Sequence, residues 1–325
     1  MRALTLTLHP AIDRVISVEQ LVPGGTFDGS LSLLVPAGKG VNTARSLRCV
    51  QPSAKISAVV WLGEAEKSWF THELKRISGV RAVVCARDCA TRIAQTFLER
   101  DARETHIKEA MPSPSSAEQR ALIACCRKAI GAGDILALCG SAPKGTPAAT
   151  LKQIFKTATG AAIAVADTNG EALKIAAQAK LHGVKGNARE IGELAGANRA
   201  LDPHAPEDQA ILSQLLSKRG APKRILMTMG ASGGALITRE HLLFAAAPQL
   251  PAGKFRSATG CGDAATAGWM WGLAEQAPDD VCLARAIACG SAKAASADPG
   301  MIDPDLMRKL LKRIQVETLH LSSPR

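Results

Sequence analysis

The chain has no tyrosine, and aromatic residues make up only 3% of its 325 residues. Its 40 Lys and Arg against 29 Asp and Glu give a formal net charge of +11, a balance that would suit nucleic-acid binding. The basic residues are dispersed, however, and few aromatic side chains are present on which bases could stack. We therefore expect a generally basic surface and no nucleic-acid partner. The densest basic stretch, MRKLLKRIQV from Met307, has apolar residues at helical spacing and predicts a solvated amphipathic helix.

A long apolar run is also missing. No stretch approaches the roughly 18 residues that would suggest a membrane span. The first residues, MRALTLTLHPAIDR, are too short and too early broken for a signal peptide. With 46% hydrophobic and 21% charged residues, the composition is that of a globular chain rather than a disordered or fibrous one. We expect a cytoplasmic protein with no membrane partner.

The nine cysteines form an odd set and lack the spacing of a metal finger. Most lie in apolar segments, as Cys139 does in DILALCG and Cys289 in AIACGSA. We therefore expect reduced, buried thiols. Cys85 and Cys89 in CARDC could alternatively form a redox or metal pair, but no histidine or second pair accompanies them locally.

Buried strands alternate with helices along most of the chain. RALTLTL alternates as a strand does, and further short apolar runs of strand length are ISAVVWL, DILALCG, AAIAVAD and KRILMTMG. Helical patterns lie between them, among them SSAEQRALIACCRKAI, GEALKIAAQAK and PEDQAILSQLLSKRG. This alternation predicts a layered α/β sheet. Ile16 to Val35 and Arg81 to Lys108 break the rhythm, and we expect them to be β-rich projections that could close over the carboxyl edge of the sheet.

A single carboxylate, Asp263, lies among small residues in TGCGDAATAG, immediately before an apolar stretch. One interpretation is a helix N-cap, because Asp oxygens accept hydrogen bonds from the unpaired amides at a helix start. The other is chemical. Gly260 and Gly262 allow a ligand close to the backbone, helix-start amides attract a phosphate, and Asp263 could then accept the proton of a hydroxyl that attacks phosphorus. Taken alone, the stretch leaves both interpretations open.

A second glycine-rich stretch, VPAGKGVNTAR, superficially suggests a P-loop. It lacks the earlier glycine and the Ser or Thr after Gly-Lys, so it is not that motif. Gly38 and Gly40 still permit close backbone approach, and Asn42 can donate and accept hydrogen bonds. A simple turn before a helix is the alternative.

Polar or glycine-rich turns also follow other expected strands. Asp13 in HPAID could bind sugar hydroxyls or be a solvated turn residue, and CGSAPKG could place Ser141 at the carboxyl edge of the sheet. DTNGEAL looks like a helix cap. In VKGNAREIGEL, the polar residues could serve phosphate, water or magnesium, although Glu190 could simply supply first-turn charge. Six such turns are hard to explain as caps alone.

AGKGVNTAR and TGCGDAATAG resemble the paired signatures of the PfkB sugar kinases, the ribokinase-like family. HPAID, GSAPKG, DTNGEAL, KGNAREI and MTMGASGG occur in the expected order, so the likeness runs from about Thr5 to Gly300. The resemblance implies a three-layer α/β/α core with a mainly parallel central sheet and a small β-sheet lid. It implies one kinase domain over 1–325, with the lid formed from about 10–36 and 85–110. It also implies ATP and Mg²⁺ as cofactors.

The resemblance carries roles residue by residue. Asp263 would be the catalytic base, and the amides of three residues would form the anion hole: Gly260, Cys261 and Gly262. The sugar would be held by Asp13, Gly38, Lys39, Asn42 and Ser141. Arg92 would bind the phosphate already on the sugar, which suits a guanidinium fork. Lys185 and Asn187 would face ATP phosphates, Glu190 would hold magnesium through water, and the nucleotide pocket would be lined by Thr228, Gly230 and Gly233.

The resemblance is strongest to the hexose-phosphate branch and implies a kinase of a phosphorylated ketohexose, with fructose 1-phosphate as the first expectation. Tagatose 6-phosphate, fructose 6-phosphate, or an unphosphorylated sugar or nucleoside remain alternatives. A non-catalytic sugar-phosphate sensor is another, motivated by Ala37 and Ala264 where the family usually has Gly and Ser. Exposed edges of the lid strands would suit a homodimer.

Overall fold

The computed structural model describes residues 1–101 and 103–319. In these residues a ten-stranded sheet forms the centre, in the order β14-β13-β12-β11-β10-β9-β8-β1-β4-β5. Its parallel strands are β1 (Arg2–Thr7), β4 (Lys55–Gly63), β5 (Arg81–Arg87), β8 (Ile135–Cys139), β9 (Ile163–Asp167), β10 (Gly183–Asn187) and β11 (Ile225–Thr228). Three antiparallel strands extend it beyond β11: β12 (Gly234–Ile237), β13 (Leu242–Ala245) and β14 (Val316–Leu319). The carboxyl ends of the parallel strands therefore share one edge.

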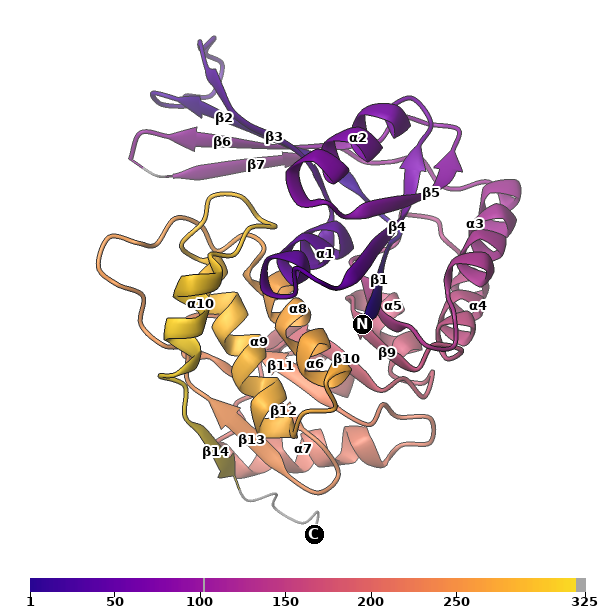
Figure 1. Cartoon of the computed structure of the whole chain (residues 1–325), viewed down its shortest axis with the longest axis vertical. Coiled ribbons are helices and arrows are strands. Elements are labelled where there is room, and N and C mark those ends of the chain that lie inside the picture. Colours follow the sequence, from indigo (N-terminus) through magenta and orange to yellow (C-terminus); the bar gives the residue numbers. More distant parts are fainter. Residues whose placement is uncertain (102, 320–325) are drawn as a thin grey trace.

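Helices cover both faces of this sheet (Figure 1). One layer contains α1 (Lys39–Val50), α2 (Lys67–Ser78), α8 (Cys261–Ala274) and α9 (Asp279–Lys293), with α10 (Pro304–Leu311) packed outside α9. The other contains α3 (Ser116–Ala129), α4 (Ala148–Ala158), α5 (Gly170–Ala176), α6 (Ala188–Ala195) and α7 (Pro206–Ser217). The predicted three-layer α/β/α architecture is confirmed.

The apolar runs form the parallel strands because a strand covered on both faces has no solvent-facing side. Every residue of β8 is buried, and β4 is buried from Ala58 to Gly63. The two faces of the sheet contribute to two separate cores: Leu136 packs toward the layer of α3 and α4, whereas Ala137 packs toward the layer of α1 and α8. Helix α8 is buried between α1, α9 and the sheet, which explains its almost uniformly apolar sequence.

A second sheet, of four strands in the described residues, projects from the body at the upper left of Figure 1. Its order is β3-β2-β6-β7, formed by β2 (Ala11–Val18), β3 (Ser30–Ala37), β6 (Ile93–Glu99) and β7 (Glu104–Lys108). The expectation that Arg81 to Lys108 projects as a whole is wrong, because β5 pairs with β4 in the large sheet. No helix separates β5 from β6, so the sequence shows one continuous β-rich run across two sheets.

The basic C-terminal stretch is shorter as a helix than predicted. Helix α10 ends at Leu311, and Val316 already opens β14, which pairs with β13. Met307 and Leu310 are buried against α8 and α9, so the helix is amphipathic as predicted. The pairing partner of Val316 is more than 70 residues away in sequence, at Ala245, and such a long-range contact overrides the local helical pattern.

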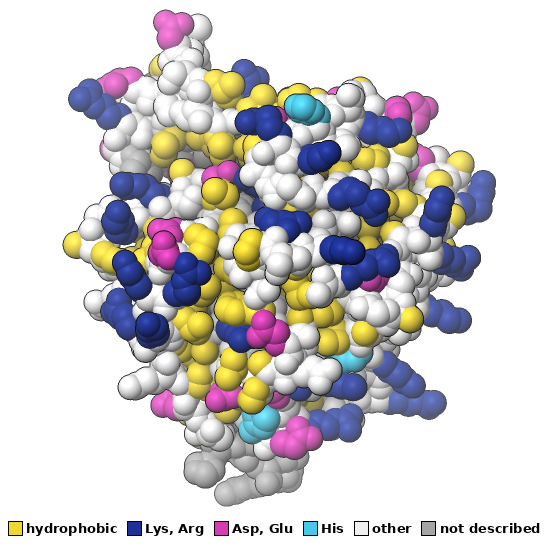
Figure 2. Space-filling model, viewed as in Figure 1, with side chains coloured by type: hydrophobic (Ala, Val, Ile, Leu, Met, Phe, Trp, Pro, Cys, Tyr) yellow, Lys and Arg dark blue, Asp and Glu magenta, His cyan; other side chains and the backbone are white. Residues whose placement is uncertain are grey.

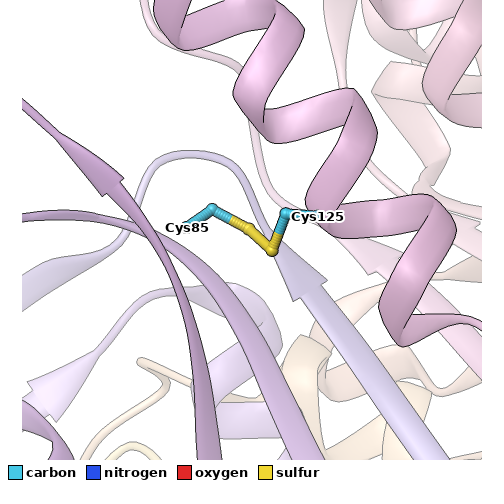
Figure 3. Close-up of a disulfide and its surroundings, with 2 residues drawn as sticks. All are labelled: Cys85 and Cys125. Carbon is cyan, nitrogen blue, oxygen red and sulfur yellow. A yellow bond between two sulfur atoms is a disulfide. The ribbon is translucent and has the colours of Figure 1, made fainter.

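Cys85 on β5 forms a disulfide with Cys125 on α3 (Figure 3). The prediction of reduced thiols is therefore wrong for these two residues, and so is the alternative that pairs Cys85 with Cys89, which is a free thiol. The other described thiols are also free: Cys49, Cys126, Cys139, Cys261, Cys282 and Cys289. The bonded residues are 40 positions apart, and only the packing of α3 against β5 brings them together.

Figure 2 shows Lys and Arg side chains spread over the visible face, several of them along its right-hand edge. Among the described helices, none is long and apolar enough to cross a membrane.

The single-domain prediction covers 1–325, of which residue 102 and residues 320–325 lie outside the described part. Elsewhere, both helix layers pack on one continuous central sheet.

Candidate functional site

The carboxyl edge of the parallel sheet collects polar residues from segments that are far apart in sequence. His9 and Ser141 follow β1 and β8, and their Nδ1 and Oγ atoms lie 3.4 Å apart. Asp167 ends β9, and Lys185 in the neighbouring strand β10 donates to it. Helices α1 and α8 begin at the same edge, where Asn42 contacts Asp263 across 221 residues of sequence. The sheet order thus gathers most of the sequence-predicted residues at one place.

Asp263 is the third residue of α8 and not its N-cap. The cap is Gly260, which has φ +86°, and a Cβ there would lie 2.2 Å from the carbonyl oxygen of Pro299. Only glycine fits this position. Asp263 is buried, with 6% of the residue exposed, and its Oδ2 accepts a hydrogen bond of 2.9 Å from Nδ2 of Asn42. The helix-cap interpretation is therefore wrong, and the carboxylate points across to α1.

The amides at the start of α8 differ in their partners. The amide of Cys261 donates to the carbonyl of Ala258 at 3.2 Å. No acceptor is found in the described chain for the amides of Gly260 and Gly262. Free amides at a helix N-terminus attract anions. Two of the three amides expected in the anion hole are therefore available to a ligand.

Helix α1 starts directly after Gly38, which has φ +116° and lies against β1: a Cβ on it would be 2.9 Å from Cγ2 of Thr7. This close approach places Lys39 and Asn42 on the first turn of α1, next to the ends of β8 and β9. Nζ of Lys39 lies 3.2 Å from Oδ1 of Asp167. The glycine-rich stretch is therefore more than a turn before a helix.

Asp167 is a residue of the site that sequence reasoning missed. Its fully buried carboxylate accepts hydrogen bonds from Lys39, from Nζ of Lys185 at 3.1 Å and from Oγ1 of Thr266 at 2.8 Å. The prediction that DTNGEAL caps a helix is confirmed, because Asn169 is the N-cap of α5, whereas Asp167 in the same stretch points into the site. The signal available in the sequence was its place directly after a buried strand.

The residues expected on the sugar side lie near the base of the small sheet. Arg92 donates from Nη2 to the carbonyl of His9 at 3.1 Å and from Nε to that of Pro10 at 3.2 Å. These bonds anchor the guanidinium beside the end of β1. Asp13 lies on β2 and is close enough to Arg92 for the two charges to interact.

The residues expected on the nucleotide side follow β10 and β11. Asn187 caps α6: its side chain accepts from the amide of Glu190 at 2.9 Å, and the Glu190 carboxylate accepts from the amide of Asn187 at 2.7 Å. Thr228 ends β11, with Oγ1 3.5 Å from the carbonyl of Gly186. Gly230 opens the 3-10 helix η1 (Gly230–Ser232), and Gly233 directly follows it. These residues form local turns, and their ligand roles stay predictions.

Residues 11–304 match the profile of the pfkB family carbohydrate kinases. The chain belongs to this family. It is 28% identical over 319 residues to the 1-phosphofructokinase of Bacillus subtilis (strain 168), covering 97% of this chain and 99% of the relative. It is 27% identical over 294 residues to the ATP-dependent 6-phosphofructokinase isozyme 2 of Escherichia coli (strain K12), covering 90% and 92%.

Among solved structures, phosphofructokinase-2 from Escherichia coli in complex with fructose-6-phosphate is similar, with a TM-score of 0.84 at 23% identity over 96% of this chain and 98% of that one. At this identity, the likeness shows the fold. Together with the family match and the near-complete relatives, it confirms the predicted family, fold class and kinase activity. The protein is a pfkB-family phosphotransferase that acts on sugars and uses ATP as phosphoryl donor.

The two buried carboxylates of this kinase are held in different states. Burial alone would raise the pKa of Asp167, but the ammonium groups of Lys185 and Lys39 outweigh it and lower that pKa to about 2. In turn, Asp167 raises the pKa of Lys39. Burial and the nearby charge of Asp167 raise the pKa of Asp263 to about 7, against the opposing effects of Lys39 and Asn42. Asp167 is therefore a fixed anion, whereas Asp263 exchanges a proton near neutral pH.

The sugar-side groups also depart from their ordinary values. Burial and the charge of Arg92 lower the pKa of His9 to about 4, so this imidazole is neutral at pH 7. Burial raises the pKa of Asp13 to about 6, although Arg92 acts in the opposite direction. At pH 7 Asp13 is mainly ionised and can accept hydrogen bonds from sugar hydroxyls.

No group of three or more His, Cys, Asp or Glu side chains suited to a metal ion is found within residues 1–101 and 103–319. This does not argue against Mg²⁺, which usually binds one or two carboxylates, several waters and the phosphates of its substrate. Glu190 would supply such a carboxylate, and it lies near enough to Lys39 for their charges to interact.

Proposed function

We propose that this kinase transfers the γ-phosphoryl group of ATP to a hydroxyl of a phosphorylated ketohexose, with fructose 1-phosphate as its substrate. The relatives named 1-phosphofructokinase support this substrate: the enzymes of Bacillus subtilis and Xanthomonas campestris pv. campestris are 28% and 29% identical over nearly the whole chain. The observation that carries the mechanism is the pair of Asp263 and Asn42 beside the open amides of Gly260 and Gly262.

In the proposed reaction, Asp263 accepts the proton of the attacking sugar hydroxyl. The hydroxyl oxygen forms the new bond to the γ-phosphorus, and the bond from that phosphorus to the bridging oxygen of ADP breaks. A base with a pKa of about 7 is well matched to this proton transfer at neutral pH. Because Asn42 holds one carboxylate oxygen, the base keeps a fixed orientation toward the hydroxyl.

The charge that spreads over the transferred group would be stabilised by fixed dipoles and cations. The open amides of Gly260 and Gly262 would receive its oxygens, and Cys261 would join them if its bond to Ala258 opens. Lys39 and Lys185, both anchored on Asp167, would supply positive charge. The ammonium of Lys39 would contact the sugar, and that of Lys185 the phosphates of ATP.

The remaining residues would bind and orient the substrates. Asp13, Gly38, Asn42 and Ser141 would hold the sugar, and Arg92 would bind its phosphate. Asn187, Thr228, Gly230 and Gly233 would line the nucleotide site, and Glu190 would hold Mg²⁺ through water. When bound, Mg²⁺ would neutralise charge on the phosphates. Because ATP is the phosphoryl donor, we expect the enzyme to act in the cytoplasm.

Fructose 6-phosphate is the second candidate substrate, favoured by the similarity to the 6-phosphofructokinase isozyme 2 of Escherichia coli. ADP release measured with ATP and Mg²⁺ on fructose 1-phosphate, fructose 6-phosphate, tagatose 6-phosphate, fructose, ribose and nucleosides separates the candidates. A kcat/KM for fructose 1-phosphate at least tenfold above the others is expected. Higher kcat/KM for another sugar would reject the proposed substrate, and binding without turnover would favour a sensor.

We also propose a homodimer formed through the small sheet. The strand register places Leu31, Leu34 and Ile107 on one face of this sheet, because residues paired across neighbouring strands point to the same face. Leu34 pairs with Arg14, Arg14 with Gln95, and Gln95 with Ile107. Leu31 pairs with Ile16, which lies two residues after Arg14 on the same strand. Leu31 and Ile107 are 55% and 53% exposed. Apolar side chains gathered on an exposed face of a sheet suit contact with a second copy of the chain.

A further inference from the structure

Lys293, the last residue of α9, is a buried ammonium to which the proposed reaction assigns no part. Its side chain is 0% exposed, and Nζ donates to the carbonyl oxygens of Ser257 at 3.3 Å and Ser296 at 2.8 Å. No carboxylate of the described chain forms an ion pair with it. Lysine is rarely buried without a paired charge, because removing an ammonium from water is costly. Two backbone carbonyls are therefore what holds this charge.

Both carbonyls belong to segments that shape the start of α8. Ser257 lies three residues before Gly260, the N-cap of that helix. The amides of Arg256 and Ser257 donate to the carbonyl of Ala294 at 2.8 and 3.3 Å. Further along, the carbonyl of Pro299 lies against Gly260 so closely that no side chain fits between them. The ammonium of Lys293 thus joins two segments by hydrogen bonds: the one that contains Ser257, just before the Gly260–Gly262 turn, and the one that contains Ser296, just after α9.

The same junction reaches α1. Asp298 accepts a hydrogen bond of 2.6 Å from Nη2 of the buried Arg45, and the carbonyl of Gly300 lies 3.4 Å from Oγ of Ser46. Arg45 is on the helix whose first turn carries Lys39 and Asn42. The segment from Ala294 to Gly300 is therefore packed between the two helices that supply the base and the residue that orients it.

The charge of Lys293 also bears on the site electrostatically. Burial lowers the pKa of Lys293 below its ordinary value, although the nearby Cys261, Asp298 and Asp263 act in the opposite direction. Its positive charge lies behind the N-terminus of α8 and adds to the partial positive charge of the helix dipole. Preorganised positive potential of this kind favours a transition state in which negative charge develops.

We propose that Lys293 is a positioning residue of phosphoryl transfer, in which its ammonium acts as a built-in cation that fixes the carbonyls of Ser257 and Ser296 behind the Gly260–Gly262 turn. This proposal rests on the proposed function. Lys293 touches neither substrate, so its effect should fall on kcat and not on substrate binding.

The test compares Lys293→Ala with Lys293→Met. In both, kcat should fall roughly 10- to 100-fold, as expected when a reacting group is displaced by up to about 1 Å, while KM for ATP and for the sugar phosphate changes less than about threefold. Lys293→Ala leaves space beside the two carbonyls, of which that of Ser257 keeps only the weak donor Sγ of Cys261 at 3.8 Å, and Lys293→Met fills this space. Ammonium ion should therefore restore kcat about tenfold in the Ala variant only. Tetramethylammonium, which has no N–H donor, should not restore it at equal ionic strength.

A kcat within threefold of wild type in both variants would overturn the proposal and leave Lys293 as a structural support. So would equal stimulation of all proteins by ammonium. If Lys293→Ala does not fold, Lys293→Gln keeps hydrogen-bond donors without the charge: a kcat lowered tenfold supports the need for a cation, and an unchanged kcat overturns it.

If the proposed function is wrong, wild-type protein shows no turnover on any sugar phosphate. This outcome differs from failure of the proposal for Lys293, in which wild type is active and the variants keep its kcat. In that case, thermal unfolding tests whether a cation binds in place of the Lys293 ammonium. Ammonium should raise the Tm of Lys293→Ala by about 2 °C or more and leave wild type and Lys293→Met unchanged. No rise in the Ala variant would overturn the cation site independently of activity.

Discussion

Asn42 donates a hydrogen bond from Nδ2 to Oδ2 of Asp263, joining the first turn of α1 to the first turn of α8. The bond fixes the orientation of a buried carboxylate whose environment otherwise favours its protonated form. Asn42 stabilises the charged form of Asp263, and Asp167 destabilises it. Together with burial, the largest cause, and the charge of Lys39, these two neighbours set the pH range in which the proposed base can act.

Asn42→Ala should therefore shift the pH dependence of the reaction. Without the donated hydrogen bond the pKa of Asp263 rises, and the pH of half-maximal kcat should move up by about one unit. At pH 7, kcat should be roughly fivefold lower and recover at higher pH. The measurement is kcat from pH 5.5 to 9, with Arg48→Ala in the last turn of the same helix as control. An unchanged midpoint with a raised KM would mean that Asn42 only binds sugar.

Asp263→Asn should be more stable than wild type above neutral pH. A carboxyl whose pKa is raised on folding holds its proton more tightly in the folded state, so the stability it contributes is lost as pH rises from about 4 toward about 7. Asn does not titrate and avoids the repulsion from Asp167. The free energy of unfolding should exceed that of wild type by about 2–4 kcal/mol at pH 8 and by little at pH 4.5.

This difference is measured by thermal or urea unfolding at several pH values, with the exposed Asp88→Asn as control. If the difference in free energy of unfolding between Asp263→Asn and wild type is the same at pH 4.5 and pH 8, the assigned titration of Asp263 is contradicted.

Arg92→Ala should weaken binding of the sugar phosphate and leave ATP unaffected. Its guanidinium is anchored on the carbonyls of His9 and Pro10, and the loss of a charge-assisted contact to phosphate should raise KM for the sugar phosphate roughly 10- to 100-fold. KM for ATP should change less than about twofold. Arg100→Ala, which removes an exposed arginine in the turn after β6, is the matched control. Equal effects on the two KM values would remove Arg92 from the phosphate site.

Leu31→Lys combined with Ile107→Lys should convert the proposed dimer to monomer. Both side chains are exposed on the same face of the small sheet, and lysines there would place four like charges in the interface of two copies. Light scattering on the eluting protein measures the mass, with the exposed Met301→Lys, outside the small sheet, as control. A wild type that is monomeric at working concentration would reject the dimer.

The central sheet was predictable because parallel strands covered on both faces appear as short apolar runs, such as DILALCG at β8. The position of Asp263 was predictable for a related reason: glycines that allow close approach, followed by a carboxylate at a helix start, form a local pattern. The sequence marks Asp167 only by its place at the end of a buried strand, and nothing in the local sequence marks Lys293. Their roles depend on contacts of Asp167 with Lys39 and Thr266 and of Lys293 with Ser257, each between residues at least 36 positions apart in sequence that meet only after folding.

The dependence on distant partners also explains which predictions about the fold are wrong. The assignment of β5 to the large sheet, the Cys85–Cys125 disulfide and the early end of α10 each depend on a partner from a distant segment. Local patterns carry no information on these partners.

Coupled ADP release from ATP and fructose 1-phosphate with Mg²⁺, compared between wild type and Asp263→Asn, directly tests whether Asp263 is the base. We predict turnover by wild type and a loss of kcat of roughly 10²- to 10⁴-fold in the variant, the range expected when a general base is removed. The unfolding curves show whether the variant is folded. Turnover by a folded Asp263→Asn at the wild-type rate would contradict the assignment of Asp263 as the base on which the proposed mechanism depends.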